Sequence, residues 1–283
     1  MIARILAALA ALFVGIAPAG AQSSPAWSRP TAPFHIAGPI WYVGTEGLGV
    51  YAVVTRDGTI LVSGPLAQSA GLIERNLATI GVRPRQIKWI LNSHAHFDHA
   101  AAFAELRRWS GAKLVASAGD APALRRGRHE ADNENGHTRF APVPVDRVVR
   151  DGEQVSVGGV ALTAVLTPGH TPGCTTWTMP VVERGRRLMV VFPCSVTVAG
   201  NHLVGNRAYP GIVADYRGSF DRLATLPADI VLPMHPDLVD LLGQAKRRDA
   251  GAPDAFVDRA VLPRLVAEAR RDFASALARA AKR

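Results

Sequence analysis

Short apolar runs bounded by glycine dominate the first part of the chain. Three of these runs are rich in β-branched and aromatic residues, which favours the strands of a meander. They are IWYVG (40–44), VYAVVT (50–55) and TILVSG (59–64). Residues 67–80 instead place their apolar side chains on one stripe at helical spacing. The next run, QIKWIL (86–91), is continuously apolar, which is typical of a strand covered on both faces.

The rest of the chain alternates predicted helices and strands. The predicted strands are residues 113–117, 160–167, 174–179, 187–193 and 229–234. The predicted helices are residues 100–109 and 211–226, followed by one or two helices within 254–282. This order reads as two similar halves, and it predicts an α/β fold: a four-layer αββα sandwich with two packed sheets and outer helices. Residues 37–283 contain no linker, so we expect a single domain there.

The N-terminal segment reads as a secretory signal peptide over residues 1–21. Arg4 precedes an apolar run at 5–16, and Ala19-Gly20-Ala21 forms a small-x-small cleavage site. The alternative is an uncleaved membrane anchor, but the run is shorter than the ~20 residues that a spanning helix needs. We therefore expect a periplasmic protein that leaves the membrane after cleavage. Residues 22–36, rich in proline and serine, read as an irregular N-terminal arm.

Charge and cysteine content restrict the partners. The formal net charge of the full chain is +9, but arginine and lysine are dispersed and lack interleaved aromatics, so we expect a solvated basic surface and no nucleic-acid partner. No sheet edge or apolar patch in the pattern requires a protein partner, so a monomer is expected.

The segments around Cys174 and Cys194 are predicted to pair as a hairpin, which would bring the two cysteines close and leaves both a disulfide and two buried thiols open.

The stretch NSHAHFDHA (92–100) follows the buried run at 86–91 and carries candidate chemistry. It places four strong metal donors within six residues: His94, His96, Asp98 and His99. Residues two apart in an extended segment point the same way, so His94 and His96 can face one site. Asp98 and His99 fall where the chain turns into the next helix. Imidazole and carboxylate donors in this number suit zinc better than they suit a structural loop.

Two further histidines stand where other apolar strands end. His170 lies in TPGHTPG (167–173), and His235 lies in VLPMHP (231–236). Together with the cluster they make six donors for two nearby metal ions: His94, His96 and His170 in one set, and Asp98, His99 and His235 in the other. The remaining histidines are His35, His129, His137 and His202. These four are expected to be non-ligands, and His129 and His137 are expected to lie nearest the mouth of the site.

Over residues 37–283 the chain resembles the metallo-β-lactamase fold superfamily. The motifs that carry this resemblance are HAHFDH, a downstream GHTPG and a third histidine after a strand. The stretches DGEQVSVGGVALTAVLTPGHTPGCTTWT, VAGNHLVG and YPGIVADYRGSFDRL resemble class B β-lactamases of subclass B3. The resemblance implies two Zn²⁺ ions per chain, bound by the two sets of donors, and hydrolysis of a small-molecule β-lactam (penicillins, cephalosporins, carbapenems) by a metal-bound hydroxide. Asp98 would orient that hydroxide and also bind the second zinc.

The strand after GHTPG distinguishes the members of this superfamily from one another. Glyoxalase II, lactonase and RNase Z relatives carry a bridging aspartate in the next strand, whereas this chain has no carboxylate between Glu183 and Asp215. The first two β-lactamase subclasses place a cysteine ligand in this region, so Cys194 is either a ligand or, as we expect, structural. Ser195 is expected to bind water or support the site, and Ser195 and Thr197 are candidate contacts for a substrate carboxylate.

Two other functions compete with β-lactam hydrolysis. The first is another exported binuclear-zinc hydrolase of this fold, a lactonase or a thioesterase, against which the missing aspartate argues. The second is an exported zinc-binding protein without catalysis, and turnover separates it from an enzyme.

Overall fold

The computed structural model describes residues 24–130, 132–134 and 136–282. The predicted signal peptide lies outside the described residues and stays a prediction. Within the described ranges, no helix combines the length and the apolar character needed to cross a membrane.

The first sheet contains seven strands in sequence order. They are β1 (Phe34–Ala37), β2 (Ile40–Tyr42), β3 (Tyr51–Thr55), β4 (Gly58–Val62), β5 (Ile87–Leu91), β6 (Lys113–Ser117) and β7 (Arg147–Val149). The first four are antiparallel because short turns join them, whereas β4 to β7 are parallel. Parallel neighbours need crossover connections, and helices supply them between β4 and β6. The carboxyl ends of β4, β5 and β6 therefore lie at one edge of the sheet.

The second sheet has the order β12-β11-β10-β9-β8. Its strands are β8 (Gln154–Val157), β9 (Val160–Leu166), β10 (Thr175–Glu183), β11 (Arg186–Phe192) and β12 (Ile230–Val231). All its pairs are antiparallel except β11 with β12. Every strand of the first sheet precedes every strand of the second in the chain.

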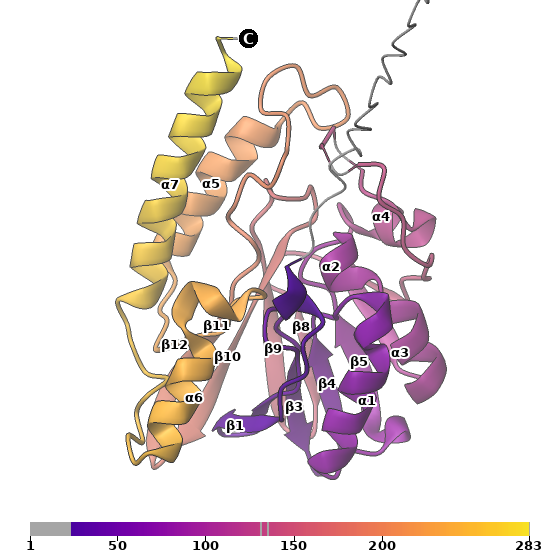
Figure 1. Cartoon of the computed structure of the whole chain (residues 1–283), viewed down its shortest axis with the longest axis vertical. Coiled ribbons are helices and arrows are strands. Elements are labelled where there is room, and N and C mark those ends of the chain that lie inside the picture. Colours follow the sequence, from indigo (N-terminus) through magenta and orange to yellow (C-terminus); the bar gives the residue numbers. More distant parts are fainter. Residues whose placement is uncertain (1–23, 131, 135, 283) are drawn as a thin grey trace, which may run out of the picture.

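Helices cover the outer face of each sheet (Figure 1). On the first sheet these are α1 (Ala70–Thr79), α2 (Phe97–Ala100), α3 (Phe103–Ser110) and α4 (Ala121–Arg126). On the second they are α5 (Ile212–Thr225) and α7 (Val261–Ala280), while α6 (Leu241–Asp249) packs at the margin of the core between the sheets. Short 3₁₀ turns are η1 (Pro25–Trp27), η2 (Ala67–Ser69), η3 (Pro84–Gln86) and η4 (Pro236–Val239).

Three apolar cores separate the four layers. The central core joins the two sheets and contains the buried Trp177, Tyr51 and Phe192. A second core lies under α1 and α3, and a third lies under α5 and α7. The predicted four-layer αββα architecture is confirmed.

Several elements differ from their predicted bounds. β1 extends into the segment expected to be irregular, because a strand of four residues next to prolines leaves too short a pattern to predict. β7 and β8 were not predicted because they have only three and four residues, and α6 was not predicted because its sequence is mostly polar and contains Gly243. The strand expected at 229–234 is reduced to Ile230–Val231, since Pro233 has no N–H to continue a ladder.

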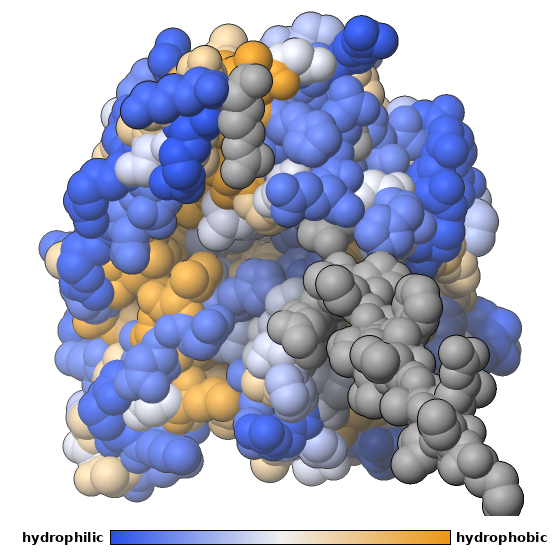
Figure 2. Space-filling view, turned by 45° about the horizontal axis from the view of Figure 1, so that its top comes forward, coloured by the Kyte–Doolittle hydropathy of each residue, from blue (hydrophilic) through white to orange (hydrophobic). Residues whose placement is uncertain are grey.

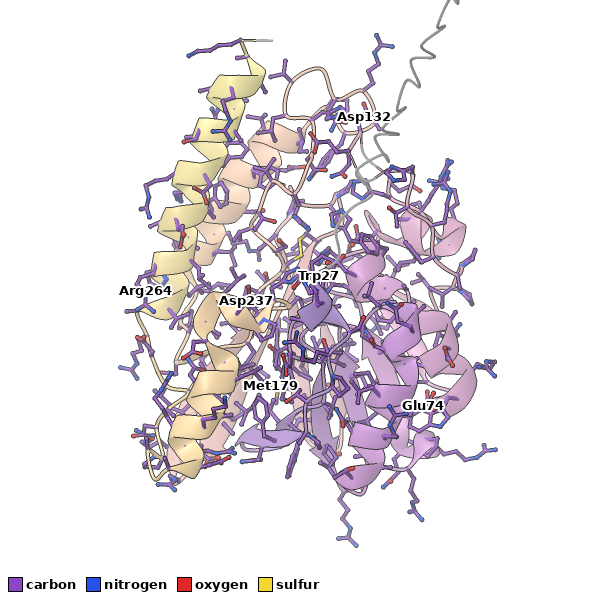
Figure 3. All side chains as sticks on the ribbon, in the orientation of Figure 1. Trp27, Glu74, Asp132, Met179, Asp237 and Arg264 are labelled. Atoms are coloured by element: carbon purple, nitrogen blue, oxygen red, sulfur yellow. A yellow bond between two sulfur atoms is a disulfide. The ribbon has the colours of Figure 1, made fainter. Side chains whose placement is uncertain are left out.

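The outer surface is mainly polar. Figure 2 shows hydrophilic side chains over most of one face, with apolar side chains in smaller groups between them. In Figure 3, Trp27 lies at the upper end of the two sheets, above Met179 in the core that joins them. That end holds the candidate site.

Candidate metal centre

The segment after β5 brings the clustered donors together. β5 ends at Leu91, His96 has an extended backbone, and α2 begins at Phe97, so Asp98 and His99 occupy the first turn of that helix, as predicted. The segment is fastened to the second sheet, because the Trp177 indole N–H donates to the Asn92 carbonyl at 3.0 Å and the Thr175 N–H donates to the Ser93 carbonyl at 2.8 Å. The second sheet therefore holds the loop that follows β5 of the first sheet.

His170 joins His94 and His96 from the end of β9. One ring nitrogen of each of these three histidines lies within 4.8 Å of the others. His170 donates its Nδ1–H to the Thr197 carbonyl at 2.8 Å, which leaves Nε2 with a free lone pair. The glycine before it is required, since Gly169 has a φ of +136° and a Cβ there would lie 2.8 Å from the Tyr216 ring.

The second predicted set also converges. His99 Nε2 lies 3.2 Å from His235 Nε2, and the Asp98 carboxylate oxygen Oδ2 lies 3.1 Å and 3.5 Å from these two atoms. His235 comes from the loop after β12, next to η4. The structure thus brings together all six predicted donors from three loops.

Burial sets the protonation states of these groups. Burial holds the pKa of His94 and His96 well below the usual value, with contributions from neighbouring imidazoles, and it lowers the pKa of His170 to about 4. Burial alone would raise the pKa of Asp98, but His99 and hydrogen bonds from His235 and His99 hold it well below the ordinary range. Neutral imidazoles and one carboxylate are the protonation states that metal binding needs.

Asp120 holds together two of the loops that carry the donors. The buried Asp120 carboxylate accepts hydrogen bonds from the Asn92 side-chain amide and from the Gly173 N–H, both at 2.9 Å. It therefore ties the loop that carries His94 to the loop that carries His170. A Cβ on Gly173 would lie 2.1 Å from the Asp120 nitrogen, so this contact also requires glycine. Burial raises the pKa of Asp120 to about 6.

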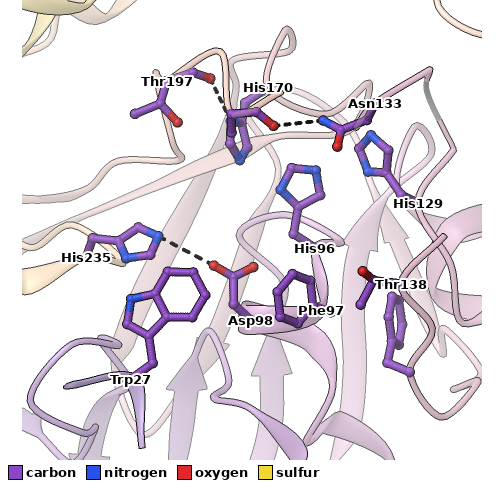
Figure 4. A pocket seen from close by; sticks show the side chains of 12 residues that line it. Trp27, His96, Phe97, Asp98, His129, Asn133, Thr138, His170, Thr197 and His235 are labelled. Atoms are coloured by element: carbon purple, nitrogen blue, oxygen red, sulfur yellow. Dashed lines mark hydrogen bonds and ion pairs between the residues drawn. The ribbon is translucent and has the colours of Figure 1, made fainter. Parts of the chain in front are cut away.

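A cavity of about 280 Å³ opens above the donors (Figure 4). Trp27, Phe97 and Phe140 give it apolar walls, and Trp27 packs against His235 with ring centroids 5.5 Å apart. Asp98 is the only carboxylate that lines the cavity within the described part of the chain. Trp27 could not be predicted as a site residue, because a single tryptophan in a proline-rich arm does not indicate where its side chain packs.

The other predicted residues fall at different distances from the cavity. Thr197 lines it, and Ser195 stands behind with its hydroxyl 3.1 Å from the Thr197 hydroxyl. His129 also lines it, as expected, whereas His137 and His202 are exposed and do not. His35 lies in β1 and contacts the Gly38 carbonyl instead.

The open question about the cysteines is resolved. Cys174 and Cys194 form a disulfide with their Cα atoms 5.8 Å apart. Cys194 is therefore structural and is not a metal ligand, as expected. The bridge joins the start of β10 to the segment after β11, and Cys194 Sγ lies 3.2 Å from the carbonyl oxygen of Ser93, the residue before His94.

Comparison with known proteins places the chain in a family. The model of the metallo-β-lactamase superfamily matches residues 49–235, so the chain belongs to that superfamily. A subclass B3 metallo-β-lactamase of Bradyrhizobium japonicum is 40% identical, with a TM-score of 0.87, over 91% of this chain and 98% of that chain. A metallo-β-lactamase of Cronobacter sakazakii with a HARLDQ motif is 39% identical, with a TM-score of 0.86, over 91% and 98%. The predicted resemblance to subclass B3 is confirmed.

Curated relatives carry other names and align over less of their length. A hydroxyacylglutathione hydrolase of Acidiphilium cryptum is 27% identical over 59% of this chain and 55% of its own length. A probable metallo-hydrolase of Burkholderia pseudomallei is 29% identical over 38% of this chain and 36% of its own length. The chain thus spans only about a third to a half of these relatives. The comparisons as a whole support a hydrolase of this superfamily.

The donor set fits zinc. Zn–N and Zn–O bonds of about 2.0–2.1 Å at tetrahedral angles separate ligand atoms by about 3.3 Å. The distances of 3.1, 3.2 and 3.5 Å among Asp98, His99 and His235 match that separation. Proteins of the metallo-β-lactamase fold bind zinc, and both sets of donors here are candidate zinc sites.

Proposed function

We propose that this chain is a zinc-dependent β-lactamase that hydrolyses the amide bond of β-lactam antibiotics and confers resistance to them. The observation that carries the proposal is a cavity that opens over two sets of metal donors. Among the described residues that line this cavity, Asp98 is the only carboxylate. The similarity to subclass B3 enzymes over nearly their whole length supports the same activity.

We propose that His94, His96 and His170 hold one Zn²⁺ and that Asp98, His99 and His235 hold a second. Zinc in these positions supplies Lewis-acid polarisation of the amide carbonyl and lowers the pKa of water. Ionised Asp98 accepts a hydrogen bond from the attacking water and so orients it toward the carbonyl carbon. The neutral imidazoles keep their lone pairs directed at the site because burial disfavours their protonation.

The walls of the cavity suit a fused, anionic bicyclic substrate. Trp27, Phe97 and Phe140 provide apolar surface for the ring system and its side chain. The Thr197 hydroxyl, backed by that of Ser195, provides a donor for the substrate carboxylate, directly or through water. We further propose that the enzyme acts in the periplasm as a monomer after removal of residues 1–21.

Hydrolysis of a chromogenic cephalosporin and of a carbapenem by purified residues 22–283 tests this proposal. Turnover is expected with added zinc, and a chelator should remove it. A protein that binds two zinc ions and leaves both substrates intact would overturn β-lactam hydrolysis.

A thioester substrate is the second candidate, because the hydroxyacylglutathione hydrolases among the curated relatives carry that activity in their name. Release of free thiol from S-lactoylglutathione, measured on the same preparations, separates the two functions. Thiol release without β-lactam turnover would favour the thioesterase.

A further inference from the structure

His129 stands against one of the proposed zinc ligands. Its ring centroid lies 4.4 Å from that of His96, as close as any other pair of imidazoles at the site. Figure 4 places the His129 ring beside His96, on the side away from Asp98 and His235. His129 comes from the loop after α4, which contributes none of the six donors.

The two ring nitrogens of His96 have different surroundings. One of them belongs to the set formed with His94 and His170. The nitrogens of an imidazole point in diverging directions, so with Nδ1 of His96 in that set, Nε2 is directed away from it. Nε2 of His96 is buried and has no hydrogen-bond partner among the described residues. A metal-bound histidine nearly always donates its second N–H, which fixes its tautomer and raises its basicity as a ligand.

His129 has a matching atom. Its own Nε2 is also buried and without a partner among the described residues. Burial lowers the pKa of His129, and the Asn201 side chain beside the ring opposes that shift. Since Nε2 is unpartnered among the described residues, Nδ1 is the nitrogen available to Asn201. If Nδ1 carries the proton and donates it to the Asn201 carbonyl oxygen, Nε2 keeps a lone pair and is an acceptor.

Asn201 fixes this arrangement relative to the other ligands. Its side-chain amide donates to the His170 carbonyl at 3.0 Å, and its carbonyl oxygen accepts a hydrogen bond from the Asn133 side chain at 2.8 Å. Asn201 is itself buried. One side chain therefore holds both the backbone of His170 and the ring of His129.

We propose that His129 is a positioning residue for the three-histidine zinc site: its Nε2 accepts the outward N–H of His96, directly or through one water molecule. This inference rests on the proposed zinc site but not on the identity of the substrate. Its consequence is a higher affinity for zinc at the site of His94, His96 and His170.

Zinc titration of the metal-free protein tests the proposal. The wild type, His129→Ala and His129→Gln are titrated with Zn²⁺ against a chromophoric chelator. His129→Ala should weaken one of the two zinc affinities about 10- to 100-fold and leave the other unchanged. His129→Gln retains an acceptor oxygen and should recover part of the loss. His137→Ala on the same loop is the matched control and should bind zinc as the wild type does.

A spectroscopic measurement separates hydrogen bonding from packing. In the zinc-loaded wild type, the outward ring N–H of His96 should give a slowly exchanging proton resonance in ¹⁵N-histidine NMR spectra, and His129→Ala should accelerate its exchange. Circular dichroism and the thermal midpoint show whether each variant is folded.

Three results would overturn the proposal: wild-type zinc affinities in His129→Ala, equal losses in the Ala and Gln variants, or unchanged exchange of the His96 proton. If the wild type binds no zinc, the zinc site itself fails. If it binds zinc with the same affinity as His129→Ala, only the role of His129 fails.

Discussion

Asp120 is a buried acid that accepts hydrogen bonds from Asn92 and Gly173, yet burial raises its pKa to about 6. The folded chain therefore holds this proton more tightly than the unfolded chain, in which the pKa of aspartate is about 3.9. The resulting stabilisation is present below about pH 4 and is lost as the pH rises through about 6. The side chain in Asp120→Asn does not titrate. Its NH₂ group also faces one of the two N–H donors, Asn92 or Gly173, that the carboxylate accepts from.

We expect Asp120→Asn to destabilise the zinc-free protein at all pH values, with a larger loss at about pH 5 than at about pH 8. The two losses should differ by about 1–3 kcal/mol, because one pKa unit corresponds to about 1.4 kcal/mol. Urea unfolding of both proteins across this range measures the difference. A loss that does not vary with pH would contradict the raised pKa.

The variant His170→Ala tests the proposed zinc site of His94, His96 and His170 directly. His170→Ala removes the one donor of its set that lies outside the 94–99 cluster, so we expect it to abolish most activity and to lower the zinc content. Metal analysis and initial rates check this prediction. His202→Ala, at an exposed position on another loop, should change neither quantity. Near-normal rates with full metal in His170→Ala would exclude the proposed ligand.

At the scale of elements, the turn η1 carries a wall of the cavity. The Gly47 N–H donates to the Ala26 carbonyl at 2.9 Å, and the Thr45 hydroxyl donates to the Trp27 carbonyl at 3.0 Å, so the main chain holds the turn without the indole. Trp27→Ala should therefore leave zinc binding intact. It should raise KM for a bulky cephalosporin about tenfold at nearly constant kcat, because lost apolar contact weakens ground-state and transition-state binding alike. Steady-state kinetics would show it, and a fall in kcat alone would contradict it.

The disulfide closes the hairpin of β10 and β11 at its open end, over a separation of 20 residues. Loop-closure entropy for this length predicts a contribution of about 3 kcal/mol to the free energy of unfolding. The Cys174→Ala/Cys194→Ala variant should lose about 2–4 kcal/mol in urea unfolding. A reductant should destabilise the wild type but not the variant, and equal sensitivity of the two would show that the bridge contributes little.

How far the sequence predicts these features depends on how local they are. The HAHFDH cluster and the strand before it are contiguous, so both the donors and their position at a strand end could be predicted from a few residues. Asp120, Asn201 and Trp27 act through contacts with residues far away in the sequence, which no local pattern encodes. The cysteines fall between these cases: hairpin pairing brings them close, but side-chain geometry decides whether they bond.

At the scale of the whole molecule, the donors come from both sheets. Four follow β5 of the first sheet, and His170 and His235 follow β9 and β12 of the second. Zinc bound there connects the two layers and binds the folded chain in preference to the unfolded chain. Free zinc at about 100 times Kd should raise the free energy of unfolding by about 2.7 kcal/mol and the thermal midpoint by several degrees. Calorimetry with zinc and with chelator measures this shift, and identical midpoints would contradict it.

The two sheets also follow one another in the chain without interleaving. A cut in the turn between Val149 and Gln154 would therefore yield two fragments, each with all the strands of one sheet. His94 and His96 would lie on one fragment and His170 on the other, so neither would carry the three-histidine set. Metal binding at that set would then report the reassembly of the split protein, and the fold offers a natural site for complementation between separately expressed halves.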